Sequence, residues 1–153
     1  MPASNGRRLA NTFACGAVPL SKELRIGHDL MAVDEVRDSV ARFGDRYLRR
    51  VYRPAELAYC QTSVAEFEMR LAARFAAKEA AIKVLRPNGE WPPWDEIEVV
   101  RHSSGWCSIA LHGSAAVLAE RENVTILSCS MSHSGSYASA VVLAQSALPS
   151  GEC

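Results

Sequence analysis

The sequence predicts an α+β fold in which an antiparallel sheet carries helices on one face. Three observations lead to this prediction. One strand-like segment opens the ordered part of the chain, and two strand pairs follow in the second half, each joined by a short turn of serine and glycine. Helix-forming segments fill the space between the first strand and the first pair. The motifs of a doubly wound nucleotide fold, such as G-x-G-x-x-G or a Walker loop, are missing.

The chain divides into three parts by composition. Residues 1–23 mix serine, asparagine, glycine and arginine without a sustained period, so we expect an N-terminal extension of uncertain order. Residues 24–146 form the predicted domain, and residues 147–153 a C-terminal tail. The domain opens with a strand at 24–33, where apolar residues dominate and Arg25, His28 and Asp29 interrupt them. This composition predicts a largely buried strand.

Helices are predicted from Asp34 to Arg86. Asp34 is the expected N-cap of a helix that ends before Gly44, and two short helical segments follow. Ser63 and Glu66 form an S-x-x-E capping box, after which glycine and proline are missing for more than 20 residues, so the long helix is predicted from there to Arg86. Its predicted core-facing stripe consists of five apolar residues: Phe67, Leu71, Phe75, Ile82 and Leu85.

The second half is predicted as two strand pairs separated by a short amphipathic helix. The breakers Pro87-Asn88-Gly89 end the long helix, and a stiff Trp-Pro-Pro-Trp loop follows. Period-two patterns and turn residues set the element bounds. The predicted strands cover 96–101, 106–111, 124–133 and 137–145, and the helix covers 114–121.

Composition excludes several classes of protein. The chain has 153 residues, of which 48% are hydrophobic and 22% charged, which is typical of one globular domain. Lys+Arg 17 balances Asp+Glu 17, so a global positive field for binding nucleic acid is not expected. We expect no membrane span, because no apolar run reaches the necessary length. The five scattered cysteines indicate neither a disulfide framework nor a zinc site, and favour a cytoplasmic protein.

Two acidic residues stand out as candidates for chemistry. Asp29 lies within the predicted buried strand, where a carboxylate needs a cation, hydrogen bonds or a metal. Its partner is either a nearby base such as Arg74 or Lys78, or a divalent ion. Glu79 lies one helical turn before Lys83, which predicts either a surface ion pair or a carboxylate and an ammonium beside a bound phosphate. In the second interpretation, Glu79 and Asp29 hold the metal together.

Histidine and serine do not form a convincing hydrolase pair. Ser132 and His133 are adjacent in a predicted strand and therefore lie on opposite faces of it. A nucleophile and its base must contact each other, so a serine hydrolase is not favoured.

Three segments together resemble the 4′-phosphopantetheinyl transferase superfamily, and most closely its holo-acyl-carrier-protein synthase branch. They are Gly27-His28-Asp29, the helix segment R-F-A-A-K-E-A at 74–80 followed by Lys83, and Ser130-Met131-Ser132-His133 followed by Tyr137-Ala138. The resemblance covers about residues 24–146. Its implied fold is the α+β fold predicted above.

The resemblance implies transfer of the 4′-phosphopantetheine group of coenzyme A to a serine of an acyl carrier protein, with release of adenosine 3′,5′-bisphosphate. It implies Asp29 and Glu79 as ligands of Mg²⁺, with Mn²⁺ as the other option, and Lys83 as a third catalytic residue on the phosphates. Arg74, Lys83 and His133 are the implied coenzyme-binding residues. The general base is left open between Glu79 and a water molecule on the metal. A homotrimer with sites between subunits is also implied.

The carrier protein is expected to dock on arginines. Six of them lie between residues 37 and 53 against two aspartates, and the family's carriers are acidic, so Arg42 and Arg46 are the predicted docking residues. Ala32 and Glu35 depart from the family pattern, in which Glu and Arg are common at these places. The carrier is therefore either that of fatty acid biosynthesis or that of a polyketide or nonribosomal peptide system. The alternatives to the transferase are a non-catalytic paralogue that binds coenzyme A or the carrier, and a metal-dependent phosphoester hydrolase.

Overall fold

The computed structural model describes residues 22–147, which form five strands and five α-helices with one short 3₁₀ helix. Most of the predicted extension and tail lies outside the described residues. The elements, in chain order, are β1 (Lys22–Ala32), α1 (Val33–Phe43), α2 (Asp45–Val51), α3 (Pro54–Cys60), α4 (Phe67–Leu85), η1 (Trp94–Glu96), β2 (Ile97–Arg101), β3 (Cys107–Leu111), α5 (Gly113–Arg121), β4 (Val124–Ser134) and β5 (Tyr137–Ala147).

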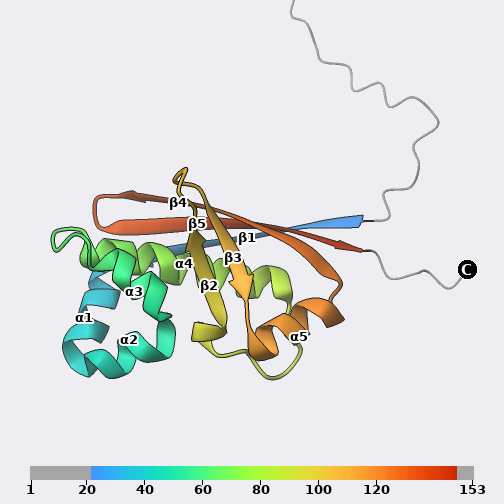
Figure 1. Ribbon diagram of the computed structural model, residues 1–153, viewed down its shortest axis with the longest axis horizontal. Helices are drawn as coiled ribbons and strands as arrows, with labels where there is room; N and C mark the ends of the chain where they lie inside the picture. The colour runs from blue at the N-terminus through green and yellow to red at the C-terminus, as the bar shows by residue number, and fades with distance from the viewer. Residues whose placement is uncertain (1–21, 148–153) are drawn as a thin grey trace, which may run out of the picture.

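All five strands form one antiparallel sheet in the order β1-β5-β4-β3-β2. Both predicted hairpins, β2 with β3 and β4 with β5, are present. The N-terminal strand β1 pairs along its whole length with β5, which brings the two ends of the described chain together. The helices lie below the long strands in Figure 1, with α4 running beneath β1 and β5. The predicted fold class is confirmed.

β1 is buried on one face only, so the prediction of a largely buried strand was wrong. Its odd-numbered residues lie opposite buried residues of β5 and face α4, whereas its even-numbered residues face outward. Three large apolar side chains of the outward face, Leu24, Ile26 and Leu30, are each more than half exposed. An antiparallel strand covered on one side exposes alternate residues, and here the exposed ones are also apolar. Within residues 22–147, no element covers this face.

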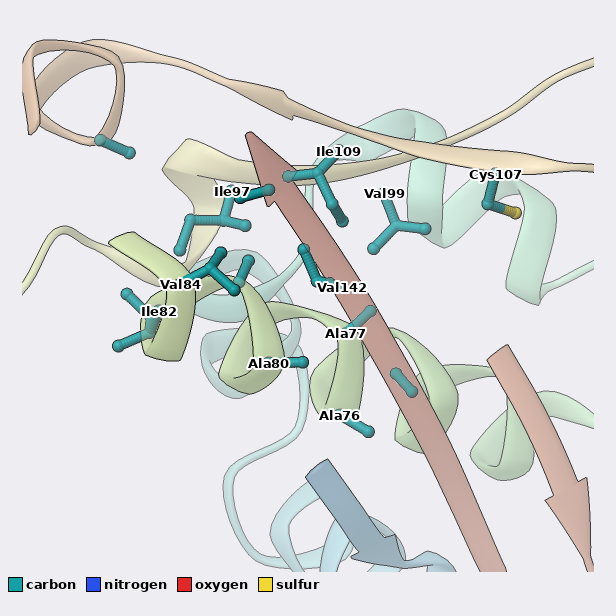
Figure 2. Packing of buried hydrophobic residues seen from close by; sticks show 14 residues of the cluster. Ala76, Ala77, Ala80, Ile82, Val84, Ile97, Val99, Cys107, Ile109 and Val142 are labelled. Carbon is teal, nitrogen blue, oxygen red and sulfur yellow. The ribbon is translucent and has the colours of Figure 1, made fainter. Parts of the chain in front are cut away.

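α4 is buried nearly all round, whereas the sequence predicted a single stripe. Alanine makes up much of its surface, and Ala72, Ala76, Ala77, Ala80 and Ala81 are all fully buried. A small side chain lets neighbouring backbones come close, so the helix packs against β1 and β5 on one side and β2 on another. Figure 2 shows alanines of this helix beside side chains of β5, β2 and β3 in one core. Phe67 and Phe75 of the predicted stripe are only partly buried.

Two predicted N-caps differ from the structure. α1 begins at Val33, so Asp34 lies inside its first turn instead of capping it. α4 begins at Phe67, and Ser63 makes no capping hydrogen bond there. The Glu66 carboxylate instead accepts two hydrogen bonds from Arg70, at 2.6 and 3.0 Å, and is therefore not free to complete a capping box.

Hydrogen bonds to the Glu96 carboxylate hold α5 against η1. The Glu96 carboxylate accepts hydrogen bonds from the Ser114 hydroxyl at 2.6 Å and the Ala115 amide at 3.0 Å, which satisfies donors at the start of α5. These contacts lower the pKa of Glu96. Gly113 precedes them with φ 50°, and a Cβ at this position would lie 2.3 Å from the Glu96 carboxylate.

Within residues 22–147, the structure has no helix that is both long and apolar enough to cross a bilayer.

Candidate functional site

The site begins with an unusually close contact between β1 and α4. Gly27 lies so near the helix that a Cβ added to it would come within 2.0 Å of the Ala80 carbonyl oxygen. Only glycine permits this approach. Two residues later, on the same face of β1, Asp29 stands opposite Ala140 of β5 and therefore points toward the helix. The contact at Gly27 thus fixes how far Asp29 stands from α4.

Asp29, Glu79 and Lys83 come together at this crossing. The Lys83 ammonium lies 2.9 Å from an Asp29 carboxylate oxygen and donates to the His28 carbonyl at 2.6 Å. Burial raises the pKa of Glu79, the negative charge of Asp29 raises it further, and Lys83 lowers it. The charge of Asp29 therefore acts on Glu79, although one residue lies on a strand and the other on a helix far away in the sequence.

The ion pair of Asp29 is of the expected kind but uses a different base. The sequence predicted a nearby arginine or lysine such as Arg74 or Lys78, and in the structure this base is Lys83. The expected pair of Glu79 with Lys83 is also replaced, because the Lys83 side chain reaches across to β1. Lys83 is 49% exposed on a flexible stem, so its ammonium can move away from Asp29 when another charge enters.

The two carboxylates fit a divalent cation with an incomplete protein shell. Mg²⁺ commonly binds through one or two carboxylates and takes its other oxygens from water and substrate phosphates. Among the described residues, no group of three or more His, Cys, Asp and Glu side chains could hold a metal. Asp29 and Glu79 would therefore leave most positions of a metal open to other oxygen ligands.

Lys78, next to Glu79 in the sequence, lies in the core and has a structural role. Its ammonium is fully buried, 2.8 Å from the Glu56 carboxylate, and donates to the carbonyls of Trp94 and Ile97. Burial lowers the pKa of Lys78, and the charge of Glu56 opposes this effect. Glu56 in turn accepts from the Val99 amide at 3.1 Å. This network joins α3, α4 and β2, and so supports the helix that carries Glu79.

Arg74 and His133 line one cavity of about 220 Å³, as expected if both contact one ligand. Register places His133 opposite the buried Ala138 and Ser132 opposite Ser139, so these neighbours face opposite sides of β4. Sequence reasoning missed three residues in this wall, Tyr59, Arg70 and Arg101. Arg70 could have been found, because it lies one turn before Arg74. Tyr59 and Arg101 come from α3 and β2, and no sequence signal links them to Arg74.

The predicted docking arginines lie on two helices. Gly44, with φ 52°, separates α1 from α2, so Arg42 and Arg46 are not one turn apart on a single helix as expected. Both side chains are exposed. Ion pairs to Asp34, Asp45 and Glu98 engage three other arginines of this region, namely Arg37, Arg49 and Arg53.

Within the described chain, no ion pair engages Arg42, Arg46 or Arg50. A hollow of about 240 Å³ lies between Phe43, Arg46, Tyr47 and Arg50. Arg50 therefore joins Arg46 in the wall of this hollow, which the sequence did not predict. This positively charged surface, with the exposed ring of Phe43 beside it, has the composition of a protein-binding site.

Known proteins similar to this chain all point to one family. The sequence model of the 4′-phosphopantetheinyl transferase superfamily matches residues 25–142. The holo-[acyl-carrier-protein] synthase of Koribacter versatilis is 40% identical over 121 residues, covering 78% of this chain and 96% of the relative, and that of Solibacter usitatus is 37% identical over 118 residues, covering 76% and 94%.

Solved structures of the same kind share the fold. The Chronobacterium ammoniagenes ACPS–CoA complex superposes with a TM-score of 0.70 at 32% identity, covering 81% of this chain and 98% of that one. The Helicobacter pylori holo-[acyl-carrier-protein] synthase in complex with coenzyme A has a TM-score of 0.68 at 27% identity, with 78% and 99% covered.

Proposed function

We propose, since the chain belongs to the 4′-phosphopantetheinyl transferase superfamily, that it transfers the 4′-phosphopantetheine group of coenzyme A to a serine of an acyl carrier protein. The observation that carries this proposal is that Asp29, Glu79 and Lys83 lie at one crossing of β1 and α4: Asp29 forms an ion pair with Lys83, and its charge raises the pKa of Glu79. Two carboxylates and a mobile ammonium match the needs of a reaction at a diphosphate. The names of the relatives, all holo-[acyl-carrier-protein] synthases, support the same activity.

In the proposed reaction, the carrier serine oxygen forms a bond to the phosphorus that bears the pantetheine arm. The bond from this phosphorus to the bridging oxygen of the diphosphate breaks, and adenosine 3′,5′-bisphosphate leaves. The serine proton passes to a base at the site. The acceptor is one of the two candidates named above, Glu79 or a water molecule held at the site.

The residues divide the remaining work. Asp29 and Glu79 would hold a divalent cation, Mg²⁺ or Mn²⁺, which when bound neutralises charge on the diphosphate. Lys83 leaves Asp29 and contacts a phosphate oxygen as a point charge. Arg74 and His133 bind the coenzyme along the cavity that they line.

The open sheet face supports a homotrimer. Besides the residues of β1, Val141 and Leu143 of β5 belong to this face and are 41% and 38% exposed. Large contiguous apolar patches on a soluble domain mark interaction sites. The cavity with Arg74 and His133 does not include Asp29, Glu79 or Lys83 in its wall. We therefore propose that the pair of acids in one subunit meets the coenzyme cavity of the next.

The carrier is proposed to dock on Arg42 and Arg46, with Arg50 as an addition from the structure. These side chains present positive charge that is not cancelled by described carboxylates, and an acidic carrier would be steered toward them. Charge reversal at Arg42 or Arg46 should raise the KM for the carrier, with a strong dependence on salt, and leave the KM for coenzyme A nearly unchanged. Arg121→Glu, a reversal on α5, is the matched control.

The decisive experiment incubates an apo carrier protein with coenzyme A, Mg²⁺ and the full chain, and follows the carrier by mass spectrometry. A mass gain equal to phosphopantetheine supports the transferase. Binding of either substrate without a mass gain supports the non-catalytic alternative. Release of nucleotide when the carrier is omitted supports a hydrolase. Parallel assays with fatty-acid, polyketide and peptide carriers identify the pathway.

Substitution of the two acids tests their assignment. Asp29→Ala and Glu79→Ala should each reduce transfer at least about a hundredfold, the magnitude typical for loss of a transition-state contact. Glu120→Ala removes an exposed carboxylate of α5 and should leave the rate unchanged. Near-normal transfer by both site variants would reject the metal assignment.

A further inference from the structure

Three arginines surround the ring of Tyr59, a residue of the last turn of α3. The guanidinium carbons of Arg74, Arg70 and Arg101 lie 4.5, 4.7 and 5.0 Å from the ring centroid. Cations within about 6 Å of an aromatic ring are attracted by its quadrupole. Because Arg70 and Arg74 come from α4 and Arg101 from β2, one aromatic side chain gathers charges from two separate elements.

The same residues form much of the wall of the 220 Å³ cavity. Tyr59 and its three arginines line it together with His133. The carboxylate in this wall is that of Glu66, which Arg70 already engages at 2.6 and 3.0 Å. With His133 counted as neutral, the charged side chains leave a net charge of plus two. The cavity therefore favours an anion.

One of these positive charges, that of Arg74, is buried and does not belong to the solvent-exposed surface. Its side chain is only 3% exposed, and its Nη1 donates to the Arg70 carbonyl at 3.2 Å. Its Nε, also buried, has no hydrogen-bond partner within residues 22–147. Buried guanidinium groups are ordinarily paired with carboxylates, and a buried donor without a partner is costly. Such a group in a cavity wall indicates a ligand that supplies the missing acceptor.

An aromatic ring and a carboxylate hold a guanidinium in different ways. A carboxylate cancels the charge and occupies the N–H groups that an anion would need. A ring attracts the cation through its face and leaves the five N–H donors free. Since forked N–H donors match phosphate oxygens, arginines held by a ring suit a phosphate group.

We propose that Tyr59 is a positioning residue that holds Arg74 and Arg101, the two arginines of this cluster without a carboxylate partner among residues 22–147, ready to bind a phosphate group of the co-substrate. Tyr59 acts through the arginines and does not itself contact the ligand. That the ligand is coenzyme A rests on the proposed function, whereas the anion site rests on the cavity alone. Either the diphosphate or the 3′-phosphate of the coenzyme supplies this chemistry.

Binding of inorganic pyrophosphate to the full chain, measured by calorimetry, tests the anion site without catalysis. Tyr59→Leu removes the ring and should weaken pyrophosphate binding at least tenfold. Tyr59→Phe keeps the ring and should bind within twofold of the parent. In transfer assays, Tyr59→Leu should raise the KM for coenzyme A about tenfold while kcat changes less than threefold. With 3′-dephospho-coenzyme A, this KM effect persists if the diphosphate is bound and disappears if the 3′-phosphate is.

The outcomes separate this proposal from the proposed function. Equal pyrophosphate affinity of Tyr59→Leu and the parent overturns it, and so does a loss in Tyr59→Phe as large as that in Tyr59→Leu. Ring-dependent pyrophosphate binding in a chain that transfers nothing to any carrier supports the anion site and rejects the transferase. If Tyr59→Leu does not fold, Arg101→Gln, at an exposed position, replaces it. Unchanged pyrophosphate binding by Arg101→Gln would equally overturn the proposal.

Discussion

Replacing Gly27 by alanine tests whether the contact between β1 and α4 positions the site. The added Cβ would lie 2.0 Å from the Ala80 carbonyl oxygen, and 2.9 Å from its carbonyl carbon. Since real Cβ atoms essentially never come within 3.0 Å of another heavy atom, β1 must move away from the helix by about 1 Å. The obstacle is backbone, so no change of side-chain rotamer can relieve it.

The expected cost follows from this geometry. Overpacking a well-filled core typically costs about 1 to 3 kcal/mol. Because the helix is fixed on several sides, we expect the upper end of this range, about 3 kcal/mol. Asp29 follows Gly27 by two residues and moves with it. A misplacement of about 1 Å can reduce a catalytic rate about a hundredfold.

Two measurements check this prediction. Urea unfolding gives the change in the free energy of unfolding, and carrier modification at a temperature where the variant is folded gives the rate. Gly135→Ala is the control, because this residue has φ 57° and no atom within 4 Å of its added Cβ. It should lose about 1 kcal/mol to backbone strain and keep its rate. A Gly27→Ala protein with parental stability and rate would refute the reasoning.

Three further variants probe other parts of the structure. Lys78→Met leaves the buried carboxylate of Glu56 uncompensated and should lower the free energy of unfolding by about 3 to 5 kcal/mol in urea titrations; a loss below 1 kcal/mol would contradict a buried charged pair. Glu96→Ala should cost about 1 kcal/mol at pH 7. Because contacts lower the pKa of Glu96 in the folded state, its contribution is complete above pH 4.5 and is lost as the pH falls through the lowered pKa, so parent and variant should converge in acid; a constant difference would argue against it. Ile26→Glu places a charge on the open sheet face and should reduce the sedimentation coefficient to that of a monomer, whereas an unchanged value would exclude this face as the subunit interface.

The fold was largely predictable from local signals. Turn residues, helix formers and period-two patterns predicted each strand and helix to within a few residues, and the antiparallel arrangement followed from their order. Burial was less predictable. Both faces of β1 carry apolar residues, so composition alone could not distinguish a strand covered on both sides from one with an exposed apolar face. Alanine also gives a weak hydrophobic signal, which concealed how much of α4 is buried.

The candidate site was predictable only in part. Asp29 and Glu79 were found because a carboxylate in a strand and a carboxylate one turn from a lysine are each unusual enough to question. Their contacts were not predictable, because the Lys83 side chain can reach either acid and the sequence does not show which one; in the structure it pairs with Asp29. Tyr59 and Arg101 stayed hidden, because a cluster built from different elements leaves no spacing in the sequence.

The exposed apolar face of β1 and β5 has a consequence for how this protein behaves at low abundance. If subunits associate through this face, each newly made chain exposes an apolar surface until it binds other subunits. The fraction of assembled protein then varies with the total protein concentration. Dilution would then abolish activity by dissociating the subunits, at concentrations where each subunit is still folded. Expression level would act as a threshold, below which carriers accumulate in their unmodified form.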